Sequence, residues 1–162
     1  MRKIIFITTG LILLGLYACQ KYEDPKITDT STYPLSGEWW VRLMDEGGNV
    51  LVDYVPFLTY NTSSNKGDSM WVDDEGNTWQ FKVKAACDVK NKTFKTDSTV
   101  SVYPGYNIKV DIKDGTVILK GAKTKTGNVT DSIYMKIGFE DDPGTVYIIA
   151  GFRRTGFKAD DY

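Results

Sequence analysis

The 162-residue chain contains no histidine. Imidazole is the usual general base of Ser-His-Asp and Cys-His hydrolytic sites, and it is the commonest protein ligand for transition metals. Its absence excludes those catalytic arrangements and every metal site that depends on imidazole. We predict neither a resident metal nor a cofactor.

Long apolar runs are also missing. None reaches the ~20 residues that a membrane-spanning helix needs. The apolar segment from Ile4 to Leu16 follows Arg2 and Lys3, a pattern typical of a secretory signal. It leads into Leu16-Tyr17-Ala18-Cys19, which is similar to the lipobox of bacterial lipoproteins, where the Cys receives a diacylglycerol. We therefore predict a signal peptide at residues 1–18 and lipidation of Cys19. An ordinary signal cut near Ala18 is the alternative.

Cysteine is scarce, with only Cys19 and Cys87 present. If Cys19 carries lipid, Cys87 has no partner and no intramolecular disulfide forms. Its neighbours in Ala85-Ala86-Cys87 indicate a small buried side chain, with a reactive thiol as the alternative. Residues 20–35 are polar and hold two prolines, so we predict a tether over residues 19–35. A barrel domain at 36–157 and a tail at 158–162 complete the expected organisation.

No excess of basic residues exists. Removal of residues 1–18 takes two of the 20 basic residues and none of the 21 acidic ones. An acidic chain lacks the cations that neutralise phosphates, so nucleic acid is not expected as a partner. The signal and anchor instead predict an exported outer-membrane lipoprotein. Glu23-Asp24, just beyond Cys19, is similar to signals that bring such proteins to the cell surface.

No window shows a helical period. Short β-type runs alternate with turn residues instead, and several runs place apolar side chains at every second position. Asp114-Gly115 predicts a hairpin turn between two of these runs, because such turns need positive φ. The expected strands cover residues 37–44, 50–60, 79–83, 108–113, 116–121, 132–139 and 146–154.

This spacing predicts an all-β fold. We expect an up-and-down antiparallel β-barrel of about 8–10 strands, because the strands follow one another through short turns. A β-sandwich is the alternative. By alternation, six apolar residues are expected to point into the barrel, where they are candidates for binding a ligand: Trp79, Phe81, Ile108, Val110, Met135 and Ile137.

The two ends of the domain carry a resemblance. Ser36-Gly37-Glu38-Trp39 is similar to the Gly-x-Trp motif that opens the first strand of lipocalins. Gly151-Phe152-Arg153-Arg154 contains the Arg that these barrels lay across that Trp. A guanidinium over an indole is worth up to ~2 kcal/mol when desolvated. The resemblance implies a Trp–Arg closure between Trp39 and either Arg153 or Arg154.

The chain as a whole resembles a family of Bacteroidetes lipoproteins called lipid-binding putative hydrolases, which have a lipocalin-like, calycin-type barrel. The residues that carry this resemblance are Ser36–Trp40, Trp71-Val72-Asp73, Trp79–Val83 and Ile149–Phe157. It implies lipid binding and hydrolysis.

The residues do not support hydrolysis. Gly67-Asp68-Ser69-Met70 is similar to the nucleophile block of GDSL esterases, but the chain has no His to accept the Ser69 proton. Cys87 lacks a base for the same reason. The acidic clusters at residues 73–75 and 140–142 could pair carboxylates for glycoside cleavage or hold Ca²⁺, yet each is followed by turn residues. We expect no catalysis.

We therefore expect a lipid-anchored envelope protein whose barrel binds a small hydrophobic ligand. Whether that barrel is hollow or filled is left open at this stage. A surface glycan-binding module, with Trp40, Trp71, Tyr103 and Tyr106 as stacking rings, is the alternative. An accessory subunit bound to another envelope protein is the third possibility.

Overall fold

The computed structural model describes residue 26 and residues 28–162 of the chain. Cys19, and with it the predicted signal and anchor, lies outside the described residues. Nine strands and one 3-10 turn follow each other along the described part: β1 (Gly37–Asp45), β2 (Val50–Asn61), β3 (Ser69–Asp73), β4 (Lys82–Asp88), β5 (Thr93–Lys95), β6 (Thr99–Val100), β7 (Lys109–Lys123), β8 (Val129–Phe139), β9 (Tyr147–Arg153) and η1 (Lys158–Asp160).

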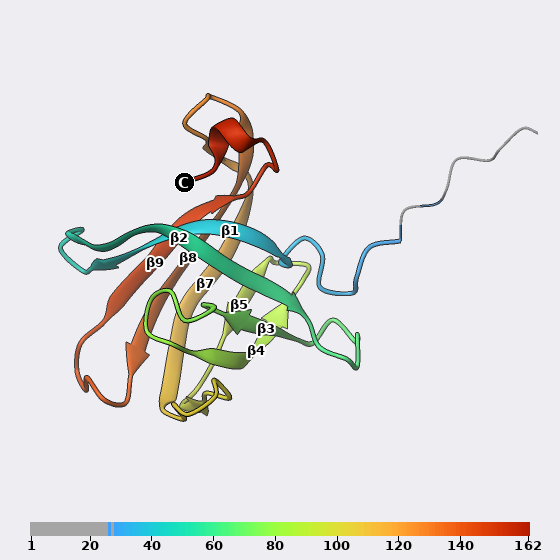
Figure 1. Cartoon of the computed structure of the whole chain (residues 1–162). Helices are drawn as coiled ribbons and strands as arrows, with labels where there is room; N and C mark the ends of the chain where they lie inside the picture. The colour runs from blue at the N-terminus through green and yellow to red at the C-terminus, as the bar shows by residue number, and fades with distance from the viewer. Residues whose placement is uncertain (1–25, 27) are drawn as a thin grey trace, which may run out of the picture.

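The strands form one antiparallel sheet that closes on itself (Figure 1). Its order is β5-β4-β3-β2-β1-β9-β8-β7-β6, and a further pairing of β5 with β7 joins the two sides. Eight strands make up the ring, with the two-residue β6 as an addition to β7. Neighbours in sequence are neighbours in the ring, apart from the β1–β9 seam. The predicted up-and-down barrel is confirmed.

The interior follows the period-two pattern of the sequence. On β8, Ile133, Met135 and Ile137 are at most 1% exposed, whereas Tyr134 and Lys136 between them are partly exposed. Alternate residues of a strand point to opposite faces of the sheet, so each strand contributes one face to a shared core. The largest buried side chains of that core include Trp39, Phe57, Phe81, Met70 and Ile112.

The barrel has two unlike ends. At the closed end, where β1 begins and β9 ends, residues 32–36 lie against the barrel. Thr32 and Leu35 are there completely buried, although the composition of residues 19–35 predicts a tether. At the far end lie the β3–β4 and β8–β9 connections and the long segment between β5 and β7. Within the described residues, no helix has the length and hydropathy to cross a bilayer.

The hairpin predicted at Asp114-Gly115 is wrong, because β7 runs through both residues without turning. Asp114 does have the positive φ of 54° that the prediction required, but it forms part of a β-bulge. One extra residue there changes which positions face inward, so that Ile112 and Val117 are both buried. Gly115 faces Phe94 of β5, where the barrel closes.

The strand predicted over residues 79–83 begins late. Gln80 has a φ of 60°, and β4 starts only at Lys82. Trp79 therefore belongs to the β3–β4 connection and is partly buried, while Phe81 and Val83 are in the core as expected. This difference places an indole over the far end of the barrel.

Candidate functional site

The closed end is sealed by Trp39 and one arginine. The guanidinium of Arg153 lies 4.4 Å from the centre of the Trp39 ring. Arg153 also donates to the carbonyls of Ser36 and Pro34, both at 2.6 Å, and its Nε lies 3.0 Å from Asp131. The same guanidinium thus ties residues 34–36 across the barrel end.

Trp39 is fixed on its other edge as well. Its Nε1 donates to Thr59 Oγ1 at 2.8 Å, and that hydroxyl donates to the Leu35 carbonyl at 2.6 Å. Gly37 lies beside this stack, where a Cβ would come 2.1 Å from Arg153 Nη1 and displace the guanidinium. The side-chain nitrogens of Trp39 and Arg153 therefore all have partners, and residues 34–36 are held over this end of the barrel.

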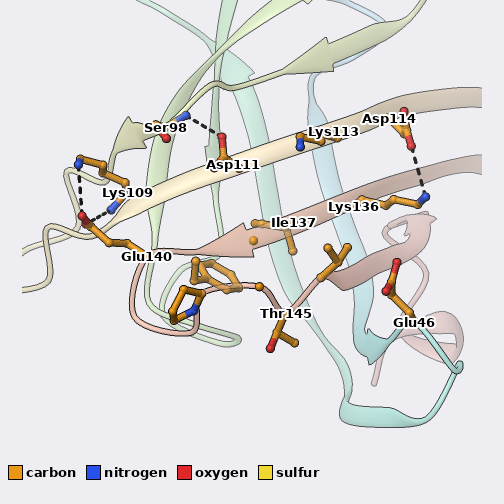
Figure 2. Close-up of a pocket in the computed structure, with 15 residues that line it drawn as sticks. Glu46, Ser98, Lys109, Asp111, Lys113, Asp114, Lys136, Ile137, Glu140 and Thr145 are labelled. Atoms are coloured by element: carbon orange, nitrogen blue, oxygen red, sulfur yellow. Dashed lines mark hydrogen bonds and ion pairs between the residues drawn. The ribbon is translucent and has the colours of Figure 1, made fainter.

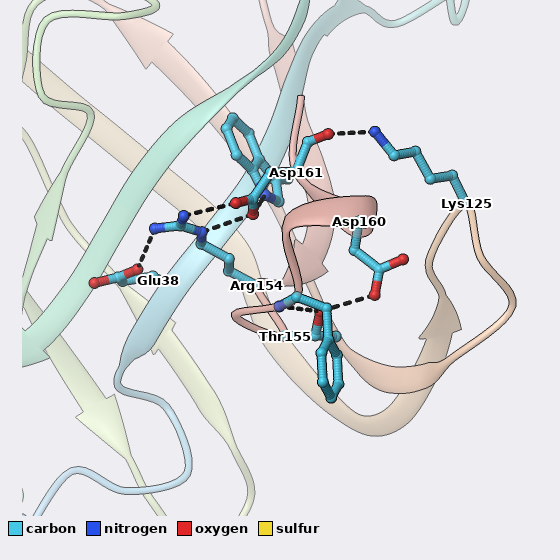
Figure 3. Close-up of polar contacts among 8 residues, drawn as sticks. Glu38, Lys125, Arg154, Thr155, Asp160 and Asp161 are labelled. Atoms are coloured by element: carbon cyan, nitrogen blue, oxygen red, sulfur yellow. Dashed lines mark hydrogen bonds and ion pairs between the residues drawn. The ribbon is translucent and has the colours of Figure 1, made fainter.

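Arg154, the other candidate for the closure, lies on the outside of the barrel. It binds Glu38 at 3.1 Å and Asp161 at 2.8 Å (Figure 3). Hydrogen bonds to Asp161 and Glu38 raise the pKa of its guanidinium. Its guanidinium lies 5.9 Å from the centre of the Trp40 ring. Because it binds both Glu38 of β1 and Asp161, Arg154 fastens the C-terminal segment to β1.

The six residues predicted to point inward divide into two groups. Phe81, Val110, Met135 and Ile137 belong to the buried core and are at most 1% exposed. Trp79 and Ile108 pack against that core while remaining partly exposed. Large side chains fill the space around them, so the interior is packed with the protein's own residues.

An aromatic cap lies over this core at the far end: Trp79, Phe81, Phe139 and Tyr147. Trp79 stacks on Phe139 with the ring centres 4.5 Å apart and the planes 4° from parallel. Tyr147 lies 5.0 Å from Trp79, and Phe81 lies 5.7 Å from Phe139. Such ring pairs add roughly 0.5–1.5 kcal/mol each beyond the area that they bury. The cap joins the β3–β4 and β8–β9 connections.

The loop that carries Trp79 is built around the buried carboxylate of Asp74. The backbone amides of Gly76, Trp79, Gln80 and Phe81 each donate to it at 2.8 Å. Thr78 adds its amide at 3.1 Å and its hydroxyl at 2.9 Å. A single carboxylate thus replaces the strand hydrogen bonds that residues 76–81 lack, and it determines where the indole lies.

Two acidic residues of the β8–β9 connection hold the cap from the opposite side. Trp79 Nε1 donates to Asp141 at 3.1 Å, and the hydroxyl of Tyr106 donates to the same carboxylate. The hydrogen bond from Tyr106 lowers the pKa of Asp141. Tyr147 donates to Asp142 at 2.5 Å, and this bond, with burial, raises the pKa of Tyr147 to about 12.

The nucleophile candidates have no catalytic surroundings. Ser69 donates to the neighbouring Asp68 at 2.9 Å. Burial and the carboxylates of Asp68 and Asp88 raise the pKa of the Cys87 thiol, which opposes the thiolate form. In the described part of the chain, no three Cys, Asp or Glu side chains are grouped so that they could hold a metal.

The four rings considered for sugar stacking have different surroundings. Trp40 is only 7% exposed and packs edge-on against Tyr162. Trp71 lies on β3 beside the ammonium of Lys82. Tyr103 and Tyr106 belong to the segment at the far end, where Tyr106 binds Asp141.

The outer wall also has a hollow, of about 670 Å³, along β7 and β8 (Figure 2). Its charged rim is internally paired, with Lys109 3.3 Å from Glu140 and Lys136 3.6 Å from Asp114. Exposed ion pairs of this kind are weak and well hydrated. The hollow borders the aromatic cap at Phe139, which contributes to its lining.

These features define the class of the protein: an eight-stranded antiparallel barrel, closed by a Trp–Arg stack at one end and capped by aromatic rings at the other. A family model described as "lipid-binding putative hydrolase" matches residues 24–158. The chain belongs to this family. No curated protein matches it. Family and fold together support the binding of a lipid or another hydrophobic molecule.

Sequence reasoning missed the two carboxylates that organise the cap. Asp74 and Asp141 both lie in acidic runs that end in turn residues, and we interpreted those runs as solvated turns. For Asp74, the following Gly76-Asn77-Thr78 is a usable signal, because a short acidic side chain often accepts from the amides that follow it. For Asp141, the partners Tyr106 and Trp79 are 35 and 62 residues away, so no local pattern reveals them.

Proposed function

We propose that this chain is a lipid-anchored envelope protein that binds one small apolar molecule at the aromatic cap, without chemistry. The observation that carries the proposal is the difference between the two barrel ends. Arg153 and residues 34–36 seal the closed end. The far end is covered by loops that meet at the aromatic cap, and Trp79 of the β3–β4 connection is the most exposed ring of that cap.

Binding then requires the cap to open, because the interior is already filled. The contacts that hold Trp79 are the ring contacts with Phe139 and Tyr147 and a few hydrogen bonds, together worth about 3 kcal/mol. An opening free energy of this size leaves on the order of one molecule in a hundred open. A ligand would replace Trp79 against Phe139 and Tyr147, and its apparent affinity would be reduced by the same factor.

The apolar ligand follows from the surfaces that opening would expose. Phe81 and Phe139 are at most 4% exposed in the capped form. Each aromatic face covered again by a ligand recovers roughly 25 cal/mol per Å². Asp141 and Tyr106 lie at the rim, where the Asp141 carboxylate can accept from a head group that donates a hydrogen bond, which suits an uncharged amphiphile such as a fatty alcohol.

Catalysis is not part of the proposal. The chain has no imidazole, the hydroxyl of Ser69 donates to the carboxylate of Asp68, and the pKa of the Cys87 thiol is raised. Export and anchoring rest on residues 1–19, where a basic start and an apolar run precede Ala18-Cys19.

The first test is native mass spectrometry of the chain from residue 20 onward, followed by solvent extraction. A reproducible lipid bound one to one supports the proposal. If the protein is isolated empty and stays empty after incubation with fatty acids and fatty alcohols, binding of an apolar ligand is refuted. Glycans and envelope proteins then become the partners to screen.

The position of the site is tested with Trp79→Ala. We expect association of a fatty alcohol to become at least ten-fold faster, because the ring that covers the site is gone. Trp71→Ala is the matched control, since it removes an indole from the outer wall and should leave the rate unchanged. Equal rates in both variants would place the site elsewhere.

A further inference from the structure

The loops at the two ends of the barrel differ in charge. Those at the far end carry many carboxylates, among them Asp45, Glu46, Glu75, Asp97, Glu140 and Asp142. Those at the closed end are mainly basic, with Lys66, Lys90, Lys123, Lys125 and Lys158. The acids at the closed end are partly engaged, since Asp160 and Asp161 accept hydrogen bonds from neighbouring side chains. The barrel is therefore electrically polarised along its axis.

The basic end also exposes large apolar side chains. The β7–β8 hairpin extends past the rim of the barrel, with η1 beside its tip (Figure 1). On it and on the adjoining C-terminal segment, four large exposed side chains carry no polar atom: Phe157 (63%), Val129 (58%), Ile118 and Leu119. Lys120, Lys123 and Lys158 are exposed among them. These seven residues share the β7–β8 hairpin and the C-terminal segment, and we call the surface that they form at this end the basic–apolar face.

Hydrogen bonds hold this face together. Asp160 accepts from Thr126 Oγ1 at 2.5 Å and from Thr155 Oγ1 at 2.8 Å, which fixes the C-terminal segment to the hairpin (the Thr155 bond is drawn in Figure 3). Lys125 reaches across to the backbone carbonyl of Asp161. The exposed apolar residues are thus presented by a braced structure.

The face is continuous with the point where the chain enters the barrel. The Lys120 amide donates to Asp131 at 2.8 Å, and Asp131 accepts from Arg153 at 3.0 Å. Arg153 in turn binds the carbonyl of Pro34, next to the half-exposed Tyr33. The segment that arrives from Cys19 and the basic–apolar face therefore lie at the same end of the molecule.

We propose that the basic–apolar face docks on an anionic phospholipid bilayer. Lysines near such a surface contribute about 1 kcal/mol each, and side chains such as Phe157 and Leu119 can enter the boundary between head groups and acyl chains. The acidic far end would point away from the like-charged membrane, leaving the aromatic cap free. This orientation extends the proposed anchoring at Cys19, but the docking itself needs no lipid on that residue.

The test is vesicle flotation with the chain from Gln20 onward. Every described strand lies within residues 37–153, so this chain keeps the whole barrel. We expect flotation with vesicles of phosphatidylglycerol and phosphatidylcholine in equal parts, little with pure phosphatidylcholine, and release at high salt. The triple variant Lys120→Gln/Lys123→Gln/Lys158→Gln should bind on the order of one hundred-fold more weakly, at about five-fold per lysine.

Matched controls come from the rest of the barrel. The triple variant Lys84→Gln/Lys95→Gln/Lys113→Gln changes the net charge equally, away from the face. Leu119→Ser/Phe157→Ser is compared with Leu51→Ser/Val102→Ser, whose residues are similarly exposed at the far end. Only the variants of the face should lose binding. Circular dichroism first establishes that all four variants are folded.

No flotation with the mixed vesicles, equal flotation with both vesicle types, or equal losses in face and control variants would each overturn the docking proposal. None of these outcomes touches the ligand proposal, because bound lipid is measured on the same preparation by extraction. Conversely, a protein that carries no extractable lipid could still float with the vesicles and lose flotation when its three lysines are replaced. That result would refute ligand binding and support the docking proposal.

Discussion

At the residue scale, Trp39 carries more contacts than its place at the start of a strand suggests. Its ring is 1% exposed, its Nε1 is bonded to Thr59, and Arg153 covers its face. Loss of the ring would leave a cavity, and it would also leave a half-buried guanidinium without the indole beneath it. The closed end depends on this one side chain.

We therefore expect Trp39→Ala to lower the free energy of unfolding by about 3–5 kcal/mol. Urea unfolding followed by far-UV circular dichroism measures the change. Trp71→Ala serves as the control, because its ring is partly exposed on the outer wall and its loss should cost clearly less. Comparable losses in the two variants would mean that Trp39 is not the centre of the closed end.

Arg153 and Arg154 show what the sequence cannot predict about a single residue: which of two neighbouring arginines stacks on Trp39. The resemblance to lipocalins predicts a Trp–Arg stack, but two consecutive arginines satisfy it equally. Neighbouring residues of a strand point to opposite faces, so one shift in register exchanges their roles. Trp39 pairs with Arg153 across the β1–β9 seam, and that pairing places Arg153 over the ring. Sequence predicts the contact, and only the register decides between the partners.

At the scale of elements, the long strands were predictable, whereas the expected ranges leave out the short strands β3, β5 and β6. Two further errors concern backbone with positive φ. Asp114-Gly115 indicates such a residue correctly, yet a hairpin turn and a β-bulge share this signature. Gln80 is the second case, since a positive φ at a glutamine has no sequence signal. In both cases a long-range contact decides the geometry: Phe94 faces Gly115, and Asp74 collects the amides around Gln80.

The bulge matters because it lets the barrel close. A Cβ at position 115 would lie 2.4 Å from the Phe94 carbonyl oxygen and 2.6 Å from its ring. Gly115→Ala should therefore push β5 away from β7 and destabilise the barrel by about 1–3 kcal/mol.

Thermal and urea unfolding, with amide exchange at residues 92–96, measure this effect. Gly138→Ala on β8 is the control, because its Cβ would meet only one atom, at 3.6 Å. If Gly115→Ala is as stable as Gly138→Ala and its β5 amides are equally protected, the β5–β7 closure does not depend on the glycine.

At the scale of the whole molecule, local patterns predicted the class of fold but not the packing. Alternation identified Phe81, Val110, Met135 and Ile137 as inward residues, and they are buried. It could not show that the interior is filled, because hollow and filled barrels use the same alternation. The aromatic cap could not be predicted either, since Trp79, Tyr106 and Asp141 come together only when the barrel has closed.

The stability of the whole barrel also depends on pH. Several carboxylates have a lowered pKa in the folded state, and Asp160 is the most shifted: burial raises its pKa, but hydrogen bonds from Thr126, Thr124, Asn128 and Thr155 outweigh burial. A carboxylate whose folded pKa lies below its unfolded value near 4 stabilises the fold fully above that value. The contribution is lost as the pH falls towards the folded pKa.

We therefore expect the urea midpoint to be level from neutral pH to about pH 5 and to decrease below about pH 4. Asp160→Asn should start from a lower midpoint at pH 7, because one accepting oxygen becomes an amide that faces donors, and it should decrease less steeply in acid. Asp97→Asn, in an exposed loop, is the control and should keep the slope of the unmodified chain. If Asp160→Asn keeps that slope too, the acid sensitivity arises elsewhere, and Asp141 and Asp161 are the next carboxylates to replace, because hydrogen bonds lower the pKa of both.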